Sequence, residues 1–395
     1  MSLAGVGVHA RSATAAPTVR VFQRAGGTSG LIGEESARRA DSVAGQDAIV
    51  YVGCYTVGAG GHGEGIVAAR RDLVSGALTP LGAAAATPAP SFLARHPELP
   101  VLYAVNEVTD GAVSAFRVAS DGGLTALGSR PTGGAEPCHL AVAPNGRHLF
   151  VANYGGGSVA VFPLDGQGMP EERTDLVRHE GHGLDPERQQ TAHTHMVAPG
   201  QEGWPLFVVD LGTDSVYLYE FDAATGRLAP RACRVPTAAG TGPRHVARHP
   251  DGRRCWLVGE LDGSVVTYEF TTEGALRQRG WVSASERPGH VQPSEIAVGP
   301  GGRFLYVANR GVGTIAVFAL DGELPVRVAE VDSGGEWPRH FALVGPNLYV
   351  ADERADLIAV FRVDPVTGVP VPAAEPVAVP SPTCVLPWTG HDDAS

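Results

Sequence analysis

The sequence has few cysteines and no long apolar run, and both absences narrow the class of protein. Its 395 residues include five cysteines, an odd number, without a Cys-x-x-Cys pair. This usage favours reduced thiols over a disulfide framework, and we expect a cytoplasmic protein. No apolar stretch is long enough to span a membrane, and no periodic pattern predicts a long helix. We therefore expect no membrane partner.

A basic patch is also missing. The chain has 30 Lys and Arg against 42 Asp and Glu, a formal net charge of −12, and no block rich in Lys or Arg. This balance argues against a nucleic-acid partner. It does not argue against a small anionic substrate, because a local group of arginines can bind an anion inside an acidic protein.

Glycine and proline are abundant, at 52 and 31 residues, and they lie between the apolar runs of a repeated sequence pattern. Six segments share one pattern, exemplified by PCHLAVAPNGRHLFVANYGGGSVAVFPL from residue 137. They begin at residues 90, 137, 193, 243, 293 and 338, so the spacing runs from 45 to 56 residues. Self-similarity at this period is typical of a β-propeller.

Each repeat predicts short antiparallel strands. In the second repeat, apolar runs at 139–142, 148–153 and 158–162 are bounded by Pro-Asn-Gly-Arg and by a glycine-rich hairpin. A fourth strand is expected in the variable stretch before the next repeat, as at 123–128. Four strands make one blade.

The two ends of the chain predict a seventh blade. Residues 48–81 supply three strands but lack the opening one, which recurs at 381–386. We therefore predict an all-β, seven-bladed propeller over 48–388, closed by pairing of N- and C-terminal strands in one blade. Closure removes free sheet edges. Residues 1–47 carry no repeat and no secretory signal, and they are expected to be a disordered or loosely attached extension; 389–395 form a C-terminal tail.

Polar residues recur where a structural repeat would carry small or apolar ones. The first strand of a propeller blade lines the central channel, and ligands normally bind at one mouth of that channel. Two rings of polar side chains are therefore expected to converge there. The opening of the repeats supplies His139, His193, Arg244, Glu295 and Arg339. The end of the second strand supplies Asn106, Glu107, Asn153, Tyr154, Asp210, Glu260, Asn309, Arg310, Asp352 and Glu353.

The repeats resemble the seven-bladed propeller lactonase family, which includes bacterial 6-phosphogluconolactonases and a carboxy-cis,cis-muconate cyclase. The resemblance covers residues 50–388. The resemblance rests on eight short sequence motifs: Tyr51–Thr56, Pro137–His139, Ala152–Gly155, Asp210–Asp214, Gly242–His245, Glu260–Leu261, Ser294–Ile296 and Ala308–Gly311.

The resemblance implies a catalytic set of His193, Arg244, Glu260 and Arg310. An arginine would stabilise the oxyanion, and either Glu260 or His193 would be the general base. Two other roles stay open: Arg244 and Glu260 as a structural ion pair, and Glu295 as a partner that orients Arg310. The further substrate contacts expected from the ring positions are His139, Asn153, His195, Glu295 and Arg339.

The predicted function is hydrolysis of a sugar lactone, similar to 6-phosphogluconolactone, by water attack on the lactone carbonyl at the channel mouth. The alternatives are a muconate-type lactonizing enzyme and a non-catalytic binding propeller. The substrate would be a small anionic lactone or carboxylate, and the protein a monomer or weak oligomer. No cofactor and no metal is expected, although His179 and His182 have ligand-like spacing. By resemblance, the loop 184–190 borders the site.

Overall fold

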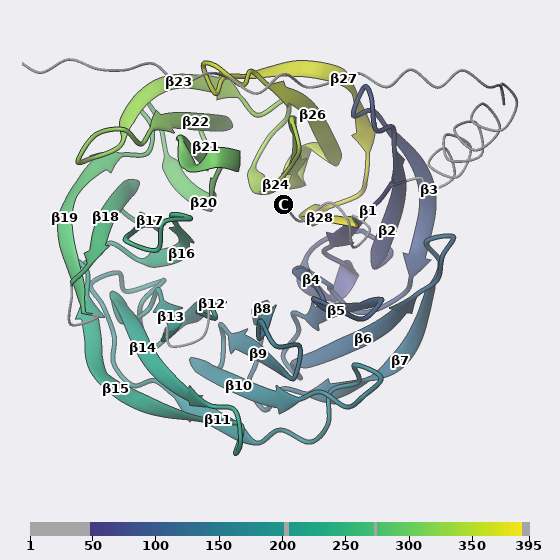
Figure 1. The fold of residues 1–395 in the computed structure, drawn as a ribbon, viewed down its shortest axis with the longest axis vertical. Coiled ribbons are helices and arrows are strands. Elements are labelled where there is room, and N and C mark those ends of the chain that lie inside the picture. The colour runs from purple at the N-terminus through teal and green to yellow at the C-terminus, as the bar shows by residue number, and fades with distance from the viewer. Residues whose placement is uncertain (1–47, 201–204, 272–274, 389–395) are drawn as a thin grey trace, which may run out of the picture. The chain divides into compact units, whose positions relative to one another are not determined.

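The computed structural model describes residues 48–200, 205–271 and 275–388, so the predicted extension and tail lie outside the described residues. Within this part of the chain, the strands form seven antiparallel sheets of four strands each. Figure 1 shows the sheets as blades arranged in a ring, which confirms the predicted fold class.

The blades are given from the innermost strand outwards. The first is β28 (Pro382–Trp388), β1 (Ala48–Cys54), β2 (Ile66–Arg71) and β3 (Leu78–Ala85). The second is β4 (Leu93–Arg95), β5 (Val101–Asn106), β6 (Ala112–Val118) and β7 (Leu124–Pro131). The third is β8 (Pro137–Val142), β9 (His148–Asn153), β10 (Ser158–Pro163) and β11 (Asp175–Arg178).

The fourth blade is β12 (Thr194–Ala198), β13 (Leu206–Asp210), β14 (Ser215–Asp222) and β15 (Arg227–Pro236). The fifth is β16 (Pro243–Arg248), β17 (Arg254–Gly259), β18 (Ser264–Phe270) and β19 (Leu276–Ser283). The sixth is β20 (Val291–Val298), β21 (Phe304–Gly311), β22 (Thr314–Ala319) and β23 (Val326–Asp332). The seventh is β24 (Pro338–Val344), β25 (Asn347–Asp352), β26 (Leu357–Val363) and β27 (Pro370–Ala378). The described residues also form three short 3₁₀ helices: η1 (Val57–Ala59), η2 (Pro300–Gly302) and η3 (Glu353–Ala355).

The two ends of the propeller meet in the first blade. β28 pairs antiparallel with β1, and Ile49 lies opposite Trp388 and Gly53 opposite Cys384. The C-terminal strand is thus the innermost strand of a blade that the N-terminal strands begin, as the repeat pattern predicts. The pairing leaves no open sheet edge at β1.

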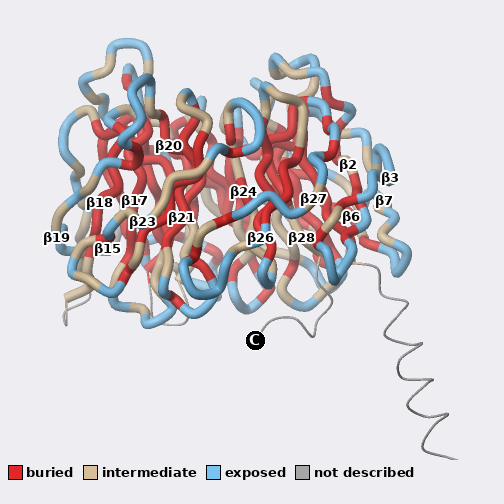
Figure 2. The backbone as a smooth tube through the Cα atoms, turned by 90° about the horizontal axis from the view of Figure 1, so that it is seen from above, coloured by how far each residue is buried: buried red, intermediate tan, exposed pale blue. Residues whose placement is uncertain are grey.

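The hydrophobic core is divided among the blades. Within the described residues, seven buried clusters each join two neighbouring blades, including one that packs Val50 and Val52 of β1 against Tyr349 and Ala351 of β25. Figure 2 shows the buried residues along the strands and the exposed ones in the loops at both ends. Each blade therefore depends on its neighbours for burial, as in other repeat architectures.

Tyrosine hydroxyls add hydrogen bonds between neighbouring blades. Four second strands carry a buried tyrosine whose hydroxyl donates to a glycine carbonyl of the next blade. The pairs are Tyr51 to Gly122 at 2.7 Å, Tyr103 to Gly168 at 2.6 Å, Tyr306 to Gly368 at 2.9 Å and Tyr349 to Gly76 at 2.8 Å. These bonds tie neighbouring blades together in addition to the packing of their hydrophobic faces.

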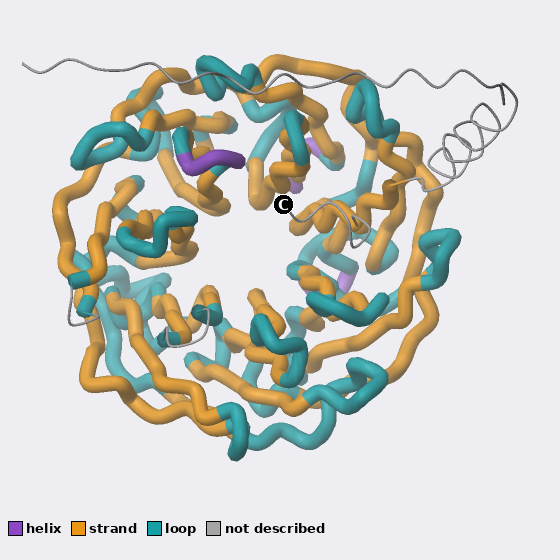
Figure 3. Tube along the Cα trace, viewed as in Figure 1, coloured by secondary structure: helices purple, strands orange, loops and turns teal. Residues whose placement is uncertain are grey.

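The innermost strands surround the central axis in Figure 3. Because the blades repeat, each repeat position becomes a ring with one residue from each blade. The third residue of the opening motif gives the ring Phe92, His139, His195, His245, Glu295, His340 and Cys384. The residue directly after the second strand's polar end gives a second ring, which we call the mouth ring: Tyr55, Glu107, Tyr154, Leu211, Glu260, Arg310 and Glu353.

Candidate active site

Glu260 of the mouth ring lies at the centre of three arginines. Arg188 Nη2 lies 2.5 Å from Glu260 Oε1, whereas Arg244 Nε and Arg310 Nη2 lie 2.9 Å and 2.7 Å from Oε2. The amide of Gln292 donates a further hydrogen bond of 3.0 Å to Oε1. We call Arg188, Arg244, Glu260 and Arg310 the basic arc, because three guanidinium groups meet one carboxylate.

The contacts on the two carboxylate oxygens differ in kind. Arg188 and Gln292 donate aligned hydrogen bonds to Oε1. The contacts on Oε2 are ion pairs without hydrogen-bond alignment, since Oε2 and Arg244 Nε are both buried without a hydrogen bond among the described residues. Burial raises the pKa of Glu260, but Arg310, Arg244, His195 and Arg188 together outweigh burial and hold this pKa well below its usual range. Glu260 therefore stays ionised and is a weak base.

The three arginines come from different parts of the fold. Arg244 is the second residue of β16, and Arg310 lies near the end of β21. Gly311 lets the chain turn directly after Arg310, because its φ is 84° and a Cβ there would lie 2.1 Å from the carbonyl oxygen of His290. Arg188 lies in the loop between β11 and β12. Burial and then Arg310 lower the pKa of Arg244 to about 10, so it remains a cation at neutral pH.

Glycine precedes Glu260 where five other blades have Asn or Asp at the same place. A Cβ at Gly259 would lie 2.2 Å from Asp262 Oδ1 and 2.7 Å from Ser264 Oγ. Asp262 Oδ1 accepts a hydrogen bond of 3.0 Å from the backbone N–H of Ser264. The carboxylate of Asp262 thus occupies the space that a side chain at 259 would need.

His193 lies beside this arc, with one ring nitrogen held by the protein. Its Nδ1 lies 2.9 Å from the carbonyl oxygen of Tyr154, and its ring stacks on that tyrosine at 4.5 Å. Its backbone N–H donates to Asp210 Oδ1 at 2.9 Å. A carbonyl oxygen only accepts, so Nδ1 carries the proton and a neutral His193 has its lone pair on Nε2. No residue described here donates to that Nε2.

The opposite side of the mouth carries a second charged group, made of Tyr55, Glu107, Arg339 and Glu353, which we call the mixed arc. The hydroxyl of Tyr55 donates to Glu107 Oε1 at 2.8 Å, and Arg339 Nη2 donates to the same hydroxyl. Arg339 also lies 3.7 Å from Glu107 Oε2 and 3.9 Å from Glu353 Oε2. Two carboxylates therefore neutralise one guanidinium, so the predicted substrate contact Arg339 is not a free cation.

Four neutral histidines lie in the third-position ring below the mouth. His139 packs between Phe92 and His245, with ring centroids at 4.1 Å and 5.3 Å, and His195 lies 5.2 Å from His245. Burial is the largest cause that lowers the pKa of His139, His195 and His245 well below the usual value. Burial also lowers the pKa of His340 to about 4, although Glu295 opposes this shift. The ring therefore carries little positive charge at neutral pH.

Glu295 belongs to this ring and contacts histidines. Its Oε2 lies 3.1 Å from His245 Nδ1 and 3.4 Å from His340 Nε2. Arg310 instead donates to the carbonyl oxygens of Gln292 and Pro293. Among the described residues, no direct contact therefore supports the expected role of Glu295 in orienting Arg310.

Asn153 lies at the end of β9 and is fully buried. Its side-chain amide donates to Ser158 Oγ at 3.1 Å, and its backbone carbonyl accepts from Thr194 Oγ1 at 3.0 Å. Its side-chain Oδ1 is buried and receives no hydrogen bond from the described residues. These contacts hold it between the hairpin of its own blade and β12 of the next blade. Its predicted contact with substrate stays a prediction.

His179 and His182 do not share a ligand position. Both ring nitrogens of His179 are hydrogen-bonded, to Asp210 Oδ2 at 2.6 Å and to the Tyr219 hydroxyl at 2.9 Å, whereas His182 is exposed. No group of three or more His, Cys, Asp or Glu residues in the described ranges could hold a metal ion. All five cysteines are free, and no helix in the described ranges has the length and apolar character that a membrane crossing needs.

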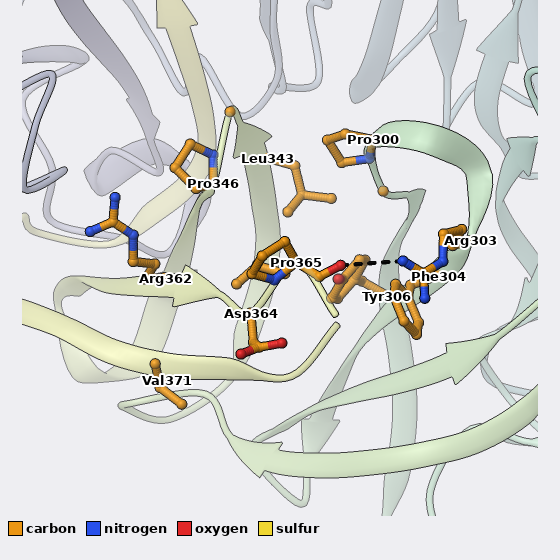
Figure 4. A pocket seen from close by; sticks show the side chains of 13 residues that line it. Pro300, Arg303, Phe304, Tyr306, Leu343, Pro346, Arg362, Asp364, Pro365 and Val371 are labelled. Atoms are coloured by element: carbon orange, nitrogen blue, oxygen red, sulfur yellow. Dashed lines mark hydrogen bonds between the residues drawn. The ribbon is translucent and has the colours of Figure 1, made fainter. Parts of the chain in front are cut away.

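A pocket of about 530 Å³ lies elsewhere, between the sixth and seventh blades. Figure 4 shows Phe304, Tyr306, Leu343 and Arg362 around it. These residues lie at the start of β21 and the end of β24, so the pocket is at the end of the blades opposite to Arg310 and Arg339. None of the predicted site residues lines it, and we assign it no role in the chemistry.

Fold and site together define a seven-bladed propeller with two charged arcs at one mouth. The family described as "Lactonase, 7-bladed beta-propeller" matches residues 49–387. The 6-phosphogluconolactonase of Bacillus subtilis (strain 168) is 34% identical over 347 residues, which cover 85% of this chain and 97% of the relative. The 6-phosphogluconolactonase of Formosa agariphila is 30% identical over 291 residues, covering 70% of this chain and 82% of the relative.

Solved structures agree with this match. The periplasmic gluconolactonase of Pseudomonas aeruginosa is 32% identical, with a TM-score of 0.80 over 87% of this chain and 99% of that one. The chain belongs to the seven-bladed β-propeller lactonase family, as the resemblance predicted.

Proposed function

We propose that the protein hydrolyses a phosphorylated sugar lactone, 6-phosphoglucono-δ-lactone, at the mouth that the two arcs form. The observation that carries the proposal is the charge of the basic arc, where three arginines share one carboxylate. Two positive charges in excess, partly shielded from water, would bind a dianion such as a phosphate. Arginine suits this task because its planar N–H groups pair with phosphate oxygens.

The names of the relatives leave two substrates to compare. Those from Bacillus subtilis and Formosa agariphila are named 6-phosphogluconolactonases, and the one from Pseudomonas aeruginosa is named a gluconolactonase. The two lactones differ by the phosphate. The excess positive charge of the basic arc favours the phosphorylated one for this chain.

His193 is the general base in this proposal. Its Nε2 takes a proton from water while the water oxygen bonds to the lactone carbonyl carbon. Arg244 or Arg310 stabilises the oxyanion. The bond between the carbonyl carbon and the ring oxygen then breaks, and His193 returns the proton to that oxygen, leaving a carboxylic acid and a hydroxyl group. Glu260 positions the arginines and, with its lowered pKa, takes no proton.

Arg188 would hold the phosphate. It is the most exposed arginine of the arc, with 37% of its side chain accessible against 3% for Arg244 and 5% for Arg310. It also donates to the Tyr154 hydroxyl at 3.3 Å, beside the tyrosine on which His193 stacks. In the lactone, the ring oxygen is flanked by the carbonyl carbon and by the carbon whose CH₂ arm carries the phosphate, so one arc can hold both the carbonyl and the phosphate.

A substrate panel tests the function. Hydrolysis of 6-phosphoglucono-δ-lactone and glucono-δ-lactone is followed by acid release, at low and at high salt. We expect kcat/KM at least about tenfold higher for the phosphorylated lactone, with a preference that shrinks as salt screens the arc. Equal kcat/KM values would contradict the phosphate assignment. If neither lactone is hydrolysed, the alternatives are a muconate-type lactonizing enzyme and a non-catalytic binding propeller. Conversion of a carboxymuconate would distinguish the enzyme from the binding propeller.

The cytoplasmic location stays a prediction from cysteine usage, since a relative of similar identity is described as periplasmic.

A further inference from the structure

The mixed arc faces the same space as the basic arc. Tyr55, Glu107 and Glu353 occupy the same repeat position as Glu260 and Arg310, at the end of the second strand of their blades. Figure 1 shows their blades, which contain β24, β28 and β4, next to one another in the ring. The Arg310 guanidinium lies 5.6 Å from the ring centre of Trp337, two residues before Arg339. The arcs are therefore two sides of one mouth.

The charge of the mixed arc excludes an anion. Arg339 is paired with Glu107 and Glu353, and it lies 4.7 Å above the ring of Tyr55. Two carboxylates and one guanidinium leave one negative charge in excess, which repels phosphate or carboxylate. A neutral ligand rich in hydroxyl groups fits this arc, because carboxylates accept hydrogen bonds from hydroxyls.

Glu353 provides an acceptor without a donor. Its Oε2 is buried and receives no hydrogen bond from the described residues, and Arg339 Nε at 3.9 Å is too far to donate one. Glu107 by contrast is fixed, because Tyr55 and Ser91 each donate to one of its oxygens. Buried acceptors are normally paired, so the Glu353 oxygen is suited to a donor that arrives with a ligand.

We propose that Glu107 and Glu353, held by Tyr55 and Arg339, form a subsite for the ring hydroxyl groups of the lactone. This inference rests on the proposed function. It also agrees with the chemistry of that substrate, in which the hydroxyl-bearing carbons lie at the edge of the ring opposite to the carbonyl and the phosphate. With the anionic edge on the basic arc, the hydroxyl edge points to the mixed arc.

Glu107→Gln and a matched control test the subsite. Glu136→Gln removes the same charge at the same face, from an exposed side chain for which no hydrogen bond or ion pair is found in the described residues. Hydrolysis is measured with glucono-δ-lactone and with δ-valerolactone, which has the same ring without hydroxyl groups. We expect Glu107→Gln to lower the ratio of the two kcat/KM values by about tenfold or more, and Glu136→Gln to leave it within about twofold.

The outcomes separate the subsite from the proposed function. A folded Glu107→Gln variant with an unchanged ratio overturns the subsite and leaves the lactonase proposal intact. If Glu107→Gln does not fold, Glu353→Gln replaces it under the same criterion. If the wild type hydrolyses neither lactone, the function fails, and the subsite is judged by saturation-transfer NMR with methyl β-D-glucopyranoside. Transfer that Glu107→Gln abolishes supports the subsite, and no transfer in the wild type overturns it.

Discussion

The fifth and seventh blades open with the same three residues, Pro-Arg-His, and place a glutamate at the same point of the mouth. In the fifth blade, Arg244 faces Glu260, and in the seventh, Arg339 faces Glu353. Yet the pKa of Arg244 falls to about 10, whereas that of Arg339 rises because Tyr55, Glu107 and Glu353 outweigh its burial. The same local pair thus ends in opposite electrostatic settings.

The difference comes from what surrounds each pair. Arg188 and Arg310 join Arg244 and Glu260, whereas Glu107 and Tyr55 join Arg339 and Glu353. A repeat therefore supplies the position of a charged residue, and neighbouring blades and loops determine its charge balance. The predictions below test whether that difference divides the work of the site, and they run from the largest expected effect to the smallest.

His193→Ala tests whether the chemistry belongs to the side of the basic arc. Removal of the base should lower kcat for the lactone by about 10²–10⁴-fold, with melting temperature little changed. His182→Ala, in the exposed loop nearby, is the control and should keep full kcat. If both variants turn over at the wild-type rate, the base lies elsewhere, and a residue of the mixed arc becomes a candidate.

Glu260→Gln tests the balance of the basic arc. Three guanidinium groups would lose their shared anion, two of them buried, so we expect a loss of about 3–5 kcal/mol in the free energy of unfolding. Millimolar phosphate should restore part of it by binding the arginines. Glu323→Gln removes an exposed partner of Arg279 and should cost less than about 1 kcal/mol. Equal losses in urea unfolding, or no effect of phosphate, would contradict this charge balance.

Arg188→Ala tests the phosphate assignment. KM for 6-phosphoglucono-δ-lactone should rise by about 10–100-fold, while KM for glucono-δ-lactone changes little, because only the first carries the phosphate. Arg147→Ala, an exposed arginine in the turn between β8 and β9, is the control. A similar rise in KM for both lactones would mean that Arg188 acts on the whole site rather than on phosphate.

The buried histidines of the third-position ring, below both arcs, predict that the folded protein loses stability in acid. The pKa of His340 is about 4 in the fold, against about 6.5 in an unfolded chain. Its stabilising contribution is complete above pH 6.5 and is lost as the pH falls toward 4, by on the order of 3 kcal/mol. His139, His195 and His245 shift in the same direction, while burial raises the pKa of Glu295 and opposes them.

His340→Phe isolates this contribution, because it keeps a ring next to Phe92. The loss of melting temperature between pH 6.5 and 4 should be smaller in the variant than in the wild type. Parallel curves would show that His340 does not titrate in this range.

The sequence predicted the ring of blades well, because a repeat cannot bury its own hydrophobic faces and has to stack on another. It predicted Arg244, Glu260 and Arg310 together, since equivalent repeat positions converge on one axis. It did not select Arg188, although the loop 184–190 was expected at the site, because that loop lies outside the repeat. Nor did it reveal the setting of Arg339, whose partner Tyr55 is 284 positions away in the chain.

His193 and His195 show a finer limit. The repeat brings His195 into the buried third-position ring, while His193 takes the place that proline holds in other blades and remains partly exposed. Two residues of the same type, two positions apart, thus have different surroundings. The structure shows these surroundings: His193 stacks on Tyr154 and its Nδ1 donates to the carbonyl oxygen of that tyrosine, whereas His195 lies against Cys138 and His245.

The division of the mouth is tested most directly by a crystal structure with the reaction product, 6-phosphogluconate. We expect its phosphate within hydrogen-bonding distance of Arg188 in the basic arc, and its hydroxyl groups on Glu107 and Glu353. A phosphate on Arg339, with hydroxyl groups on the basic arc, would contradict the account.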